Sequence, residues 1–299
     1  MPQFFAEILQ LFKRPVCRAS AIAGLFFLLG PPPAPAQRPN DTVVQPGMER
    51  IDQEEGAQRL RAFRQQRLDG DYVFEFQLEH KPRRARTSRY DGIMWGTWNE
   101  AGALTRIRLF DGDPATGEDE RPSTDWIVQN GPNPKAWIRP DGQADFQLIE
   151  GAAIFEPLLE GLSYSIFDLQ MPFIYWPEFE YEGPELVGAS RIAQTFLMLA
   201  PEESPSWEHG IRAVRIGLDD TYNALLRIEV LGEAGEERSR FQIESFKKVQ
   251  EQYIVKKITL TDYPSKDRTT FHVTDASVGI ELDSSLFEEA GHPGRLPGI

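Results

Sequence analysis

The sequence predicts a mainly β (α+β) fold, in which a curled antiparallel sheet forms a half-open β-barrel covered by a short helical lid. Most of the chain after residue 70 alternates between apolar and polar residues, as strands with one buried face do. The turns between the predicted strands are too short to hold crossover helices, so neighbouring strands must be antiparallel. Residues 154–179 interrupt this pattern with the densest apolar run outside the N-terminal region.

A helix and five strands are predicted before this apolar run. Residues 48–68 place apolar side chains on one stripe among Glu, Gln and Arg, which is typical of an amphipathic helix that packs on the fold. The period then changes from 3.6 to 2, because Tyr72, Phe74 and Phe76 alternate with Val73, Glu75 and Gln77. Gly-, Asn- and Pro-rich turns separate the strands. The five predicted strands are 72–78, 90–98, 104–110, 126–129 and 136–139.

Six more strands are predicted after the apolar run, and short polar turns join the last five into a meander. A sheet of about ten or eleven strands does not stay flat, so we expect it to curl into a barrel or a strongly bent half-barrel. The six predicted strands are 191–199, 211–218, 224–231, 238–249, 253–263 and 268–278.

The apolar run at 154–179 predicts two short helices. Pro157, Pro172 and Pro177 limit each helical piece to a few turns, and acidic residues exclude a bilayer span of about 20 apolar residues. A curled sheet has a concave apolar face, and the helices at 48–68 and 158–176 are the elements able to cover it. An ordinary helical part of a filled core explains the run equally well.

The N-terminal region predicts export. Basic residues precede an apolar segment at 19–30, and Ala34-Pro35-Ala36 forms a small-residue cleavage site, as in a secretory signal peptide. We therefore divide the chain into a signal peptide (1–36), a flexible leader (37–47), a single half-barrel domain (48–282) and a C-terminal tail (283–299). We expect a soluble protein in the periplasm, with the signal peptide cleaved near Ala36.

Composition and motifs exclude several function classes. The formal net charge of −14 argues against nucleic acid and anionic membrane surfaces as partners. Cys17, the only cysteine, lies in the predicted signal peptide, so the mature chain has no disulfide or thiolate site. The four histidines show no ligand spacing, and no nucleophile elbow, phosphate-binding loop or dinucleotide fingerprint occurs. Glu178, Glu180 and Glu182 line one face of an extended segment, which an exposed strand face explains better than a Ca²⁺ site. We expect no metal, no cofactor and no enzymatic activity, although Glu180 or Asp220 could belong to an unrecognised carboxylate site.

Four segments of the sequence resemble a known family. They are YDGIMWG at 90–96, GPNPKAW at 131–137, FDLQMPFIYWP at 167–177 and LDDTYNALLR at 218–227. These segments are similar to those of exported bacterial proteins known as outer-membrane lipoprotein-sorting proteins, which are related to LolA, and the resemblance runs from about residue 68 to 278. It implies an open β-barrel with a helical lid and a hydrophobic cavity that shields the acyl chains of a lipoprotein.

The expected function is therefore a carrier that holds the acyl chains of a lipoprotein or lipid in a hydrophobic cavity. The alternative is a non-enzymatic interaction or scaffold subunit of an envelope complex, with envelope membrane proteins as partners and the same apolar segment as the docking surface. Large apolar side chains of the strands and the lid are the predicted cavity lining: Phe74, Phe76, Trp95, Leu159, Ile166, Phe167, Leu169, Met171, Phe173 and Trp176.

Overall fold

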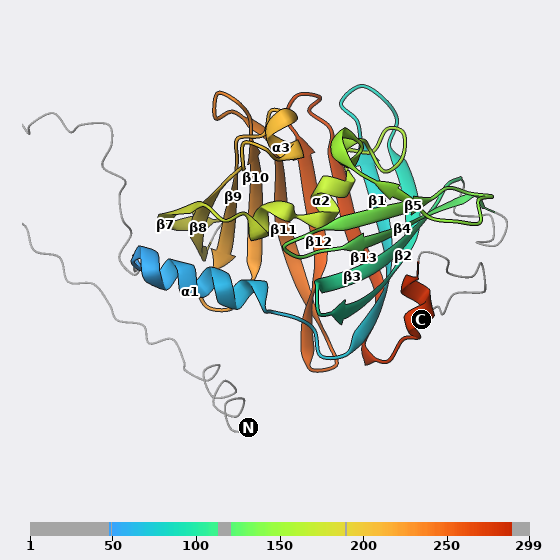
Figure 1. Ribbon diagram of the computed structural model, residues 1–299, viewed down its shortest axis with the longest axis horizontal. Coiled ribbons are helices and arrows are strands. Elements are labelled where there is room, and N and C mark those ends of the chain that lie inside the picture. The colour runs from blue at the N-terminus through green and yellow to red at the C-terminus, as the bar shows by residue number, and fades with distance from the viewer. Residues whose placement is uncertain (1–47, 49, 113–120, 189, 289–299) are drawn as a thin grey trace, which may run out of the picture. The chain divides into compact units, whose positions relative to one another are not determined.

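The computed structural model describes residue 48 and residues 50–112, 121–188 and 190–288, and the strands in these ranges form one thirteen-stranded antiparallel sheet (Figure 1). The predicted signal peptide, the predicted leader and the end of the predicted tail lie outside the described residues.

The elements follow one another with short connections. The strands are β1 (Asp71–Lys81), β2 (Ser88–Asn99), β3 (Gly102–Phe110), β4 (Ser123–Gln129), β5 (Lys135–Arg139), β6 (Gln147–Ile149), β7 (Phe179–Val187), β8 (Arg191–Leu199), β9 (Ala213–Asp219), β10 (Leu225–Leu231), β11 (Glu237–Val249), β12 (Gln252–Asp262) and β13 (Arg268–Ile280). The helices are α1 (Gln53–Arg64), α2 (Ile166–Gln170) and α3 (Pro205–Glu208), with 3₁₀ turns η3 (Gly151–Phe155), η4 (Pro172–Tyr175) and η5 (Ser284–Phe287).

The order of the strands shows that the sheet is open, with β6 and β7 at its edges. It runs β6-β5-β4-β3-β2-β1-β13-β12-β11-β10-β9-β8-β7, so only β1 and β13 pair without being neighbours in the sequence. The two edge strands, β6 and β7, are joined directly by the segment that contains η3, α2 and η4. Figure 1 shows α2 in front of the sheet, between the β4–β5 side and the β7–β8 side. The apolar run of the sequence thus links the two edges of the sheet.

Glycines in β2 let aromatic rings of β1 lie flat on the sheet. Gly96 is paired with Tyr72 and Gly92 with Phe76. A Cβ atom at Gly96 would lie 1.9 Å from the Tyr72 ring, and one at Gly92 would lie 2.4 Å from the Phe76 ring. Glycines allow a sheet to bend, and aromatic rings that cover them help to fix the register of the paired strands. Because the rings cover the glycines on one side, this side becomes the inner side of the curve.

The two faces of the sheet carry separate clusters. The lid face, which includes Phe76 and Ile107, packs against the buried Phe167 and Phe173 of the helical segment and forms the main core. The opposite, outer face carries a smaller cluster around Val73 and Trp95, which the turn η5 covers.

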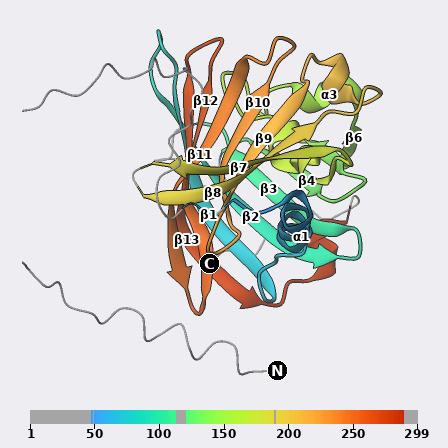
Figure 2. The same cartoon turned by 90° about the vertical axis from the view of Figure 1, so that its left-hand side faces the viewer.

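The N-terminal helix is attached to the open edge at β7. Asp52 caps α1 by accepting a hydrogen bond from the Glu55 amide at 2.8 Å. Gln53 then uses its side-chain amide like a neighbouring strand: its Oε1 accepts from Tyr181 N at 3.0 Å, and its Nε2 donates to Phe179 O at 3.4 Å. Figure 2 shows α1 end-on beside the sheet. This contact satisfies part of the exposed edge of β7.

The predicted fold class is confirmed: the protein has a mostly antiparallel sheet, not closed into a barrel, with few helices. The helix expected at 48–68 is shorter, since α1 ends at Arg64. Strand β6 was not predicted, and β7 was expected only as an extended segment around residues 178–182; these two strands bring the sheet from about eleven strands to thirteen. The helices predicted in the apolar run are a five-residue α-helix and 3₁₀ turns.

Candidate functional site: an apolar cavity under the helical segment

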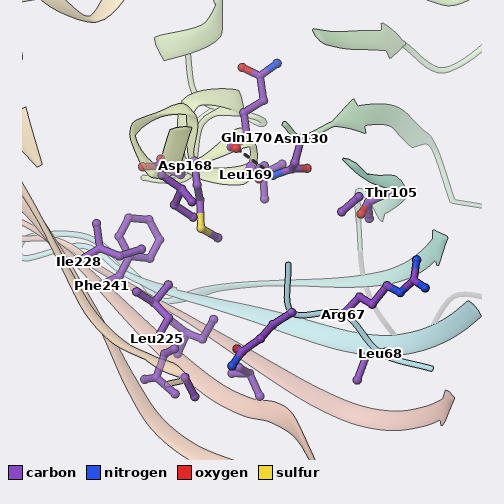
Figure 3. Close-up of a pocket in the computed structure, with 18 of the residues that line it drawn as sticks. Arg67, Leu68, Thr105, Asn130, Asp168, Leu169, Gln170, Leu225, Ile228 and Phe241 are labelled. Carbon is purple, nitrogen blue, oxygen red and sulfur yellow. Dashed lines mark hydrogen bonds between the residues drawn. The ribbon is translucent and has the colours of Figure 1, made fainter. Parts of the chain in front are cut away.

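A cavity of about 740 Å³ lies between the lid face of the sheet and the segment that links β6 to β7. Figure 3 shows Leu225, Ile228 and Phe241 on one side of it and Thr105 on another, with α2 above. Most of the lining is apolar or aromatic, and a volume of this size is within the range of ligand sites. The apolar lining comprises Phe63, Leu68, Tyr72, Phe74, Met94, Trp98, Ile107, Val128, Leu169, Met171, Ile174, Leu225, Ile228, Phe241, Ile243, Phe246, Val255, Ile258 and Phe271.

Two side chains hold the helical segment over the cavity. Asn130, in the turn between β4 and β5, donates from Nδ2 to Leu169 O at 2.9 Å and to Gln170 O at 2.8 Å, and so satisfies carbonyls at the end of α2. Arg64, in the last turn of α1, donates from Nε to Ile174 O at 2.7 Å and from Nη2 to Trp176 O at 3.3 Å. The segment is therefore fixed from both the sheet and α1.

The local sequence of α2 explains its short length. Ser165 and Asp168 form a capping box, in which the Asp168 carboxylate accepts from both the amide and the hydroxyl of Ser165 at 2.8 Å. Met171 ends the helix in the left-handed conformation (φ 44°, ψ 52°), and Pro172 begins η4. A bulky residue seldom adopts this backbone conformation, which costs about 1–3 kcal/mol. Met171 lies in the cavity wall, so the strained residue is part of the site.

The cavity contains one ionisable carboxyl group among its buried lining residues. Burial raises the pKa of Asp168 to about 6, although its hydrogen bonds from Ser165 act in the opposite direction. Tyr164 also lines the cavity, and its buried hydroxyl has no hydrogen-bond partner among the described residues. Burial raises the pKa of this phenol. The lining of the cavity is thus mostly apolar, and its buried polar side chains besides Tyr164 are Asp168, Thr105, Gln170 and Arg227.

The predicted lining residues lie in three places. Phe74, Leu169 and Met171 line the cavity. Phe76, Ile166, Phe167, Phe173 and Trp176 are buried in the main core of the lid face, and the half-buried Leu159 packs against that core. Trp95 is fully buried on the outer face, in the cluster with Val73.

Sequence reasoning missed much of the lining that comes from the second half of the chain. Leu225, Phe241 and Ile258 line the cavity from β10, β11 and β12. Strand alternation places these residues on a common face, but it does not say which face is the inner one. In β2, the glycines at 92 and 96 share a face with Met94 and Trp98, and this spacing is the signal that could have favoured Met94 over Trp95.

The described residues do not place Glu180 and Asp220 together as a carboxylate site. Glu180 lies on the edge strand β7, whereas Asp220 is in a turn, 3.3 Å from Arg59, and accepts from Gln194 at 2.6 Å. Within the described ranges, no three His, Asp or Glu side chains come together as a group able to hold a metal. The helices in the same ranges are all too short or too polar to cross a membrane.

The sequence matches no known family model and no curated protein. Solved structures match it well. A DUF1329 family protein from Desulfovibrio piger superposes with a TM-score of 0.67 at 11% identity, covering 79% of this chain and 97% of that chain. A domain assigned to outer membrane lipoprotein sorting, from Vibrio parahaemolyticus, has a TM-score of 0.65 at 15% identity, over 78% of this chain and 94% of its own. A LolA superfamily protein from Nitrosomonas europaea has a TM-score of 0.56 at 10% identity, over 78% and 96%.

The fold is LolA-like. The resemblance stated from the sequence is confirmed at the level of the fold, since two of these structures carry the lipoprotein-sorting or LolA name. Identities of 10–15% show a shared fold alone. A function for this chain therefore has to be argued from the cavity.

Proposed function

We propose that the protein is a periplasmic carrier that holds acyl chains of a lipoprotein or lipid in the cavity under the helical segment. The observation that supports this proposal best is the cavity itself, about 740 Å³ of mostly apolar space. Each CH₂ group removed from water contributes about 0.8 kcal/mol, so ten of them would contribute about 8 kcal/mol before the costs of binding. The LolA-like neighbours support the same carrier class.

The way in which the cavity is covered also supports a carrier, which must load and release its ligand. The cover is a segment of short helical turns, which its apolar side chains in the main core and side-chain hydrogen bonds from Asn130 and Arg64 attach to the rest of the fold. Such contacts can break and re-form without loss of the sheet, because the strands pair among themselves. We propose that movement of this segment controls loading and release.

The test is native mass spectrometry with organic extraction, on protein recovered from the periplasm without detergent. We expect the wild-type protein to carry an extractable acylated molecule. Leu225→Trp, which places a large ring in the cavity, should reduce the bound mass, because Leu225 is a half-buried lining residue. Leu186→Trp is the matched control, since Leu186 is 38% exposed on β7 and does not line the cavity. Bare wild-type protein that also takes up no added acyl lipid would refute the carrier role.

A second candidate function, an interaction subunit of an envelope complex, rests on a second cavity. This cavity, of about 410 Å³, lies beside the edge strand β6 and is lined by Trp176 and by prolines of three segments, with Leu148 49% exposed at its side. Open edges and exposed apolar side chains are common in protein interfaces. A Leu148→Arg variant that keeps its acyl ligand but loses a stoichiometric envelope partner would favour this second role.

A further inference from the structure

Arg67, at the mouth of the cavity, has no hydrogen-bond or ion-pair partner among the described residues. Arg67 lies in the short connection between α1 and β1, is exposed and lines the cavity. Arg64, three residues earlier, already donates hydrogen bonds to the carbonyls of Ile174 and Trp176. Arg67 is therefore available to a ligand in a way that Arg64 is not.

The connection that carries Arg67 is held in place on both sides. Gln66 donates from Nε2 to Tyr222 O at 3.3 Å. The side-chain amide of Gln252 accepts from Asp69 N at 2.7 Å and donates to Asp69 O at 3.0 Å. These contacts fix the connection next to Arg67 on the turn before β10 and on the first residue of β12. A guanidinium on a fixed backbone loses less entropy when it binds an anion.

The polarity of the cavity sets the direction in which an amphipathic ligand would enter. Asp168 lies at the α2 side, and Figure 3 shows Arg67 on a different side, with Leu68 and Thr105. An anionic group placed near the Asp168 carboxylate would be repelled, whereas near Arg67 it would be attracted. Tyr222 and Tyr253, which line the cavity and are 68% and 69% exposed, add aromatic surface at its edge. Tyrosine suits such a boundary between apolar and wet surroundings.

We infer that Arg67 binds the anionic head group of an acyl ligand whose chain occupies the cavity, so that the preferred ligand is an acyl lipid with a carboxylate or a phosphate. This inference rests on the proposed carrier function and narrows it. Arginine pairs with both groups through two parallel N–H···O bonds, and the two sources are a free fatty acid and a phospholipid.

The experiment compares three probes that share a sixteen-carbon chain: hexadecanoate, hexadecyl phosphate and hexadecanol. Binding of each is measured below its micelle concentration by displacement of a fluorescent acyl probe from the wild-type protein and from two variants. Arg67→Gln removes the charge at the mouth. Arg61→Gln is the matched control, because Arg61, in the last turn of α1, is also exposed but does not line the cavity.

We expect the wild type to bind at least one anionic probe more tightly than hexadecanol, and Arg67→Gln to weaken that probe about tenfold without changing hexadecanol. Arg61→Gln should bind like the wild type. Raising the salt concentration should reduce the anion preference of the wild type and leave that of Arg67→Gln unchanged. An effect confined to hexadecanoate indicates a fatty acid, and one confined to hexadecyl phosphate indicates a phospholipid.

The failures of the two proposals are distinguishable. If all three probes bind the wild type and Arg67→Gln equally, the role of Arg67 is refuted and the carrier function stands. If no probe binds the wild type, the carrier function itself fails.

Discussion

Asp168 places a titratable group where the helical segment meets the cavity. Its carboxyl has a pKa of about 6 in the folded protein, mainly because of burial, against an ordinary value of 3.8. The folded protein therefore binds this proton more tightly than the unfolded chain does. The stabilisation from the protonated form is complete below about pH 3.8 and is lost as the pH rises through 6.

Asp168→Asn should remove this pH dependence. Asn keeps an oxygen acceptor for the Ser165 amide, which now bonds to the carboxylate, so the cap of α2 can persist. Between pH 4.5 and 7.5, we expect the free energy of unfolding of the wild type to fall by about 2 kcal/mol relative to the variant. Urea unfolding of both proteins at several pH values measures this difference. Parallel curves for the two proteins would show that Asp168 titrates normally.

Asp125 shows the opposite behaviour on the outer face. Arg108, Asp125 and Arg139 lie directly opposite one another on β3, β4 and β5, and Arg106 also donates to this carboxylate. Burial alone would raise the pKa of Asp125, but hydrogen bonds and charges from Arg108 and Arg106 lower it to about 2. Its stabilising effect is present above pH 3.8 and lost towards pH 2. The pH windows of Asp125 and Asp168 meet at 3.8 without overlap, so above pH 4.5 the difference between the wild type and Asp168→Asn contains no contribution from Asp125.

Individual residues also show how far a sequence can define the site. Alternation in β2 shows that Met94 and Trp95 point to opposite faces, but both residues are large and apolar, so hydrophobicity alone favours neither. The contact that identifies the inner face is the packing of the Tyr72 ring on Gly96. Tyr72 belongs to β1 and Gly96 to β2, so this contact is known only once the register of the two strands is fixed. The apolar character of β1 and of the helical segment predicted Phe74 and Leu169, which line the cavity, but it did not distinguish them from Phe76, Ile166 and Phe167, which are buried in the main core.

At the scale of the elements, the helical segment is held by its apolar side chains in the main core and by hydrogen bonds from Asn130 and Arg64. Its 3₁₀ turn η4 is attached to α1 through the guanidinium of Arg64, which donates to Ile174 O and Trp176 O and lies 5.8 Å from the centre of the Tyr175 ring. Hydrogen bonds from a charged donor contribute about 1.5–3 kcal/mol each. Loss of Arg64 should therefore loosen this end of the segment while the sheet stays intact.

Arg64→Met keeps the length of the side chain and removes its donors. We expect amide hydrogen exchange in residues 166–176 to become at least about tenfold faster, while exchange in β1 and β13 stays unchanged. Arg61→Met, on the same turn of α1 and outside the cavity lining, is the control and should exchange like the wild type. Equal exchange in 166–176 for Arg64→Met and wild type would mean that Asn130 and the core hold the segment by themselves.

The elements that sequence analysis predicted and those it missed differ in a physical property. The long strands of the meander have clear alternation, because one face is buried along their whole length. Strand β7 contains Gly183 and Pro184, which weaken a strand prediction, yet an edge strand tolerates proline because one side of it needs no partner. Strand β6 has three residues, too few for a period to be recognised. The strand that was missed and the strand that was predicted only in part are thus the two edges of the sheet.

At the scale of the molecule, the topology separates stability from access. All sheet pairs are local in sequence except β1 with β13, which joins the two halves of the sheet at its centre. The helical segment connects the two edge strands, β6 and β7. The strands stay paired with one another whether or not this segment is in place. A fold built in this way can keep an apolar cavity under a cover that moves. An empty apolar cavity is also unfavourable, because its lining lacks contact partners.

Ligand binding should therefore stabilise the whole molecule. A neutral acyl probe such as hexadecanol, at about 100 times its dissociation constant, adds about 2.7 kcal/mol to the free energy of unfolding, which raises the melting temperature by about 5–10 °C. Differential scanning calorimetry measures this shift.

The two cavity variants show whether the stabilisation comes from the cavity. Leu225→Trp occupies part of the space that the chain would fill, so its shift should be smaller at the same concentration of hexadecanol. Leu186→Trp, whose site is on the exposed edge strand, should show the full shift. Equal shifts in all three proteins would mean that the probe binds elsewhere, for example at the groove beside β6, and the interaction role would then become the better explanation of the exposed apolar surface.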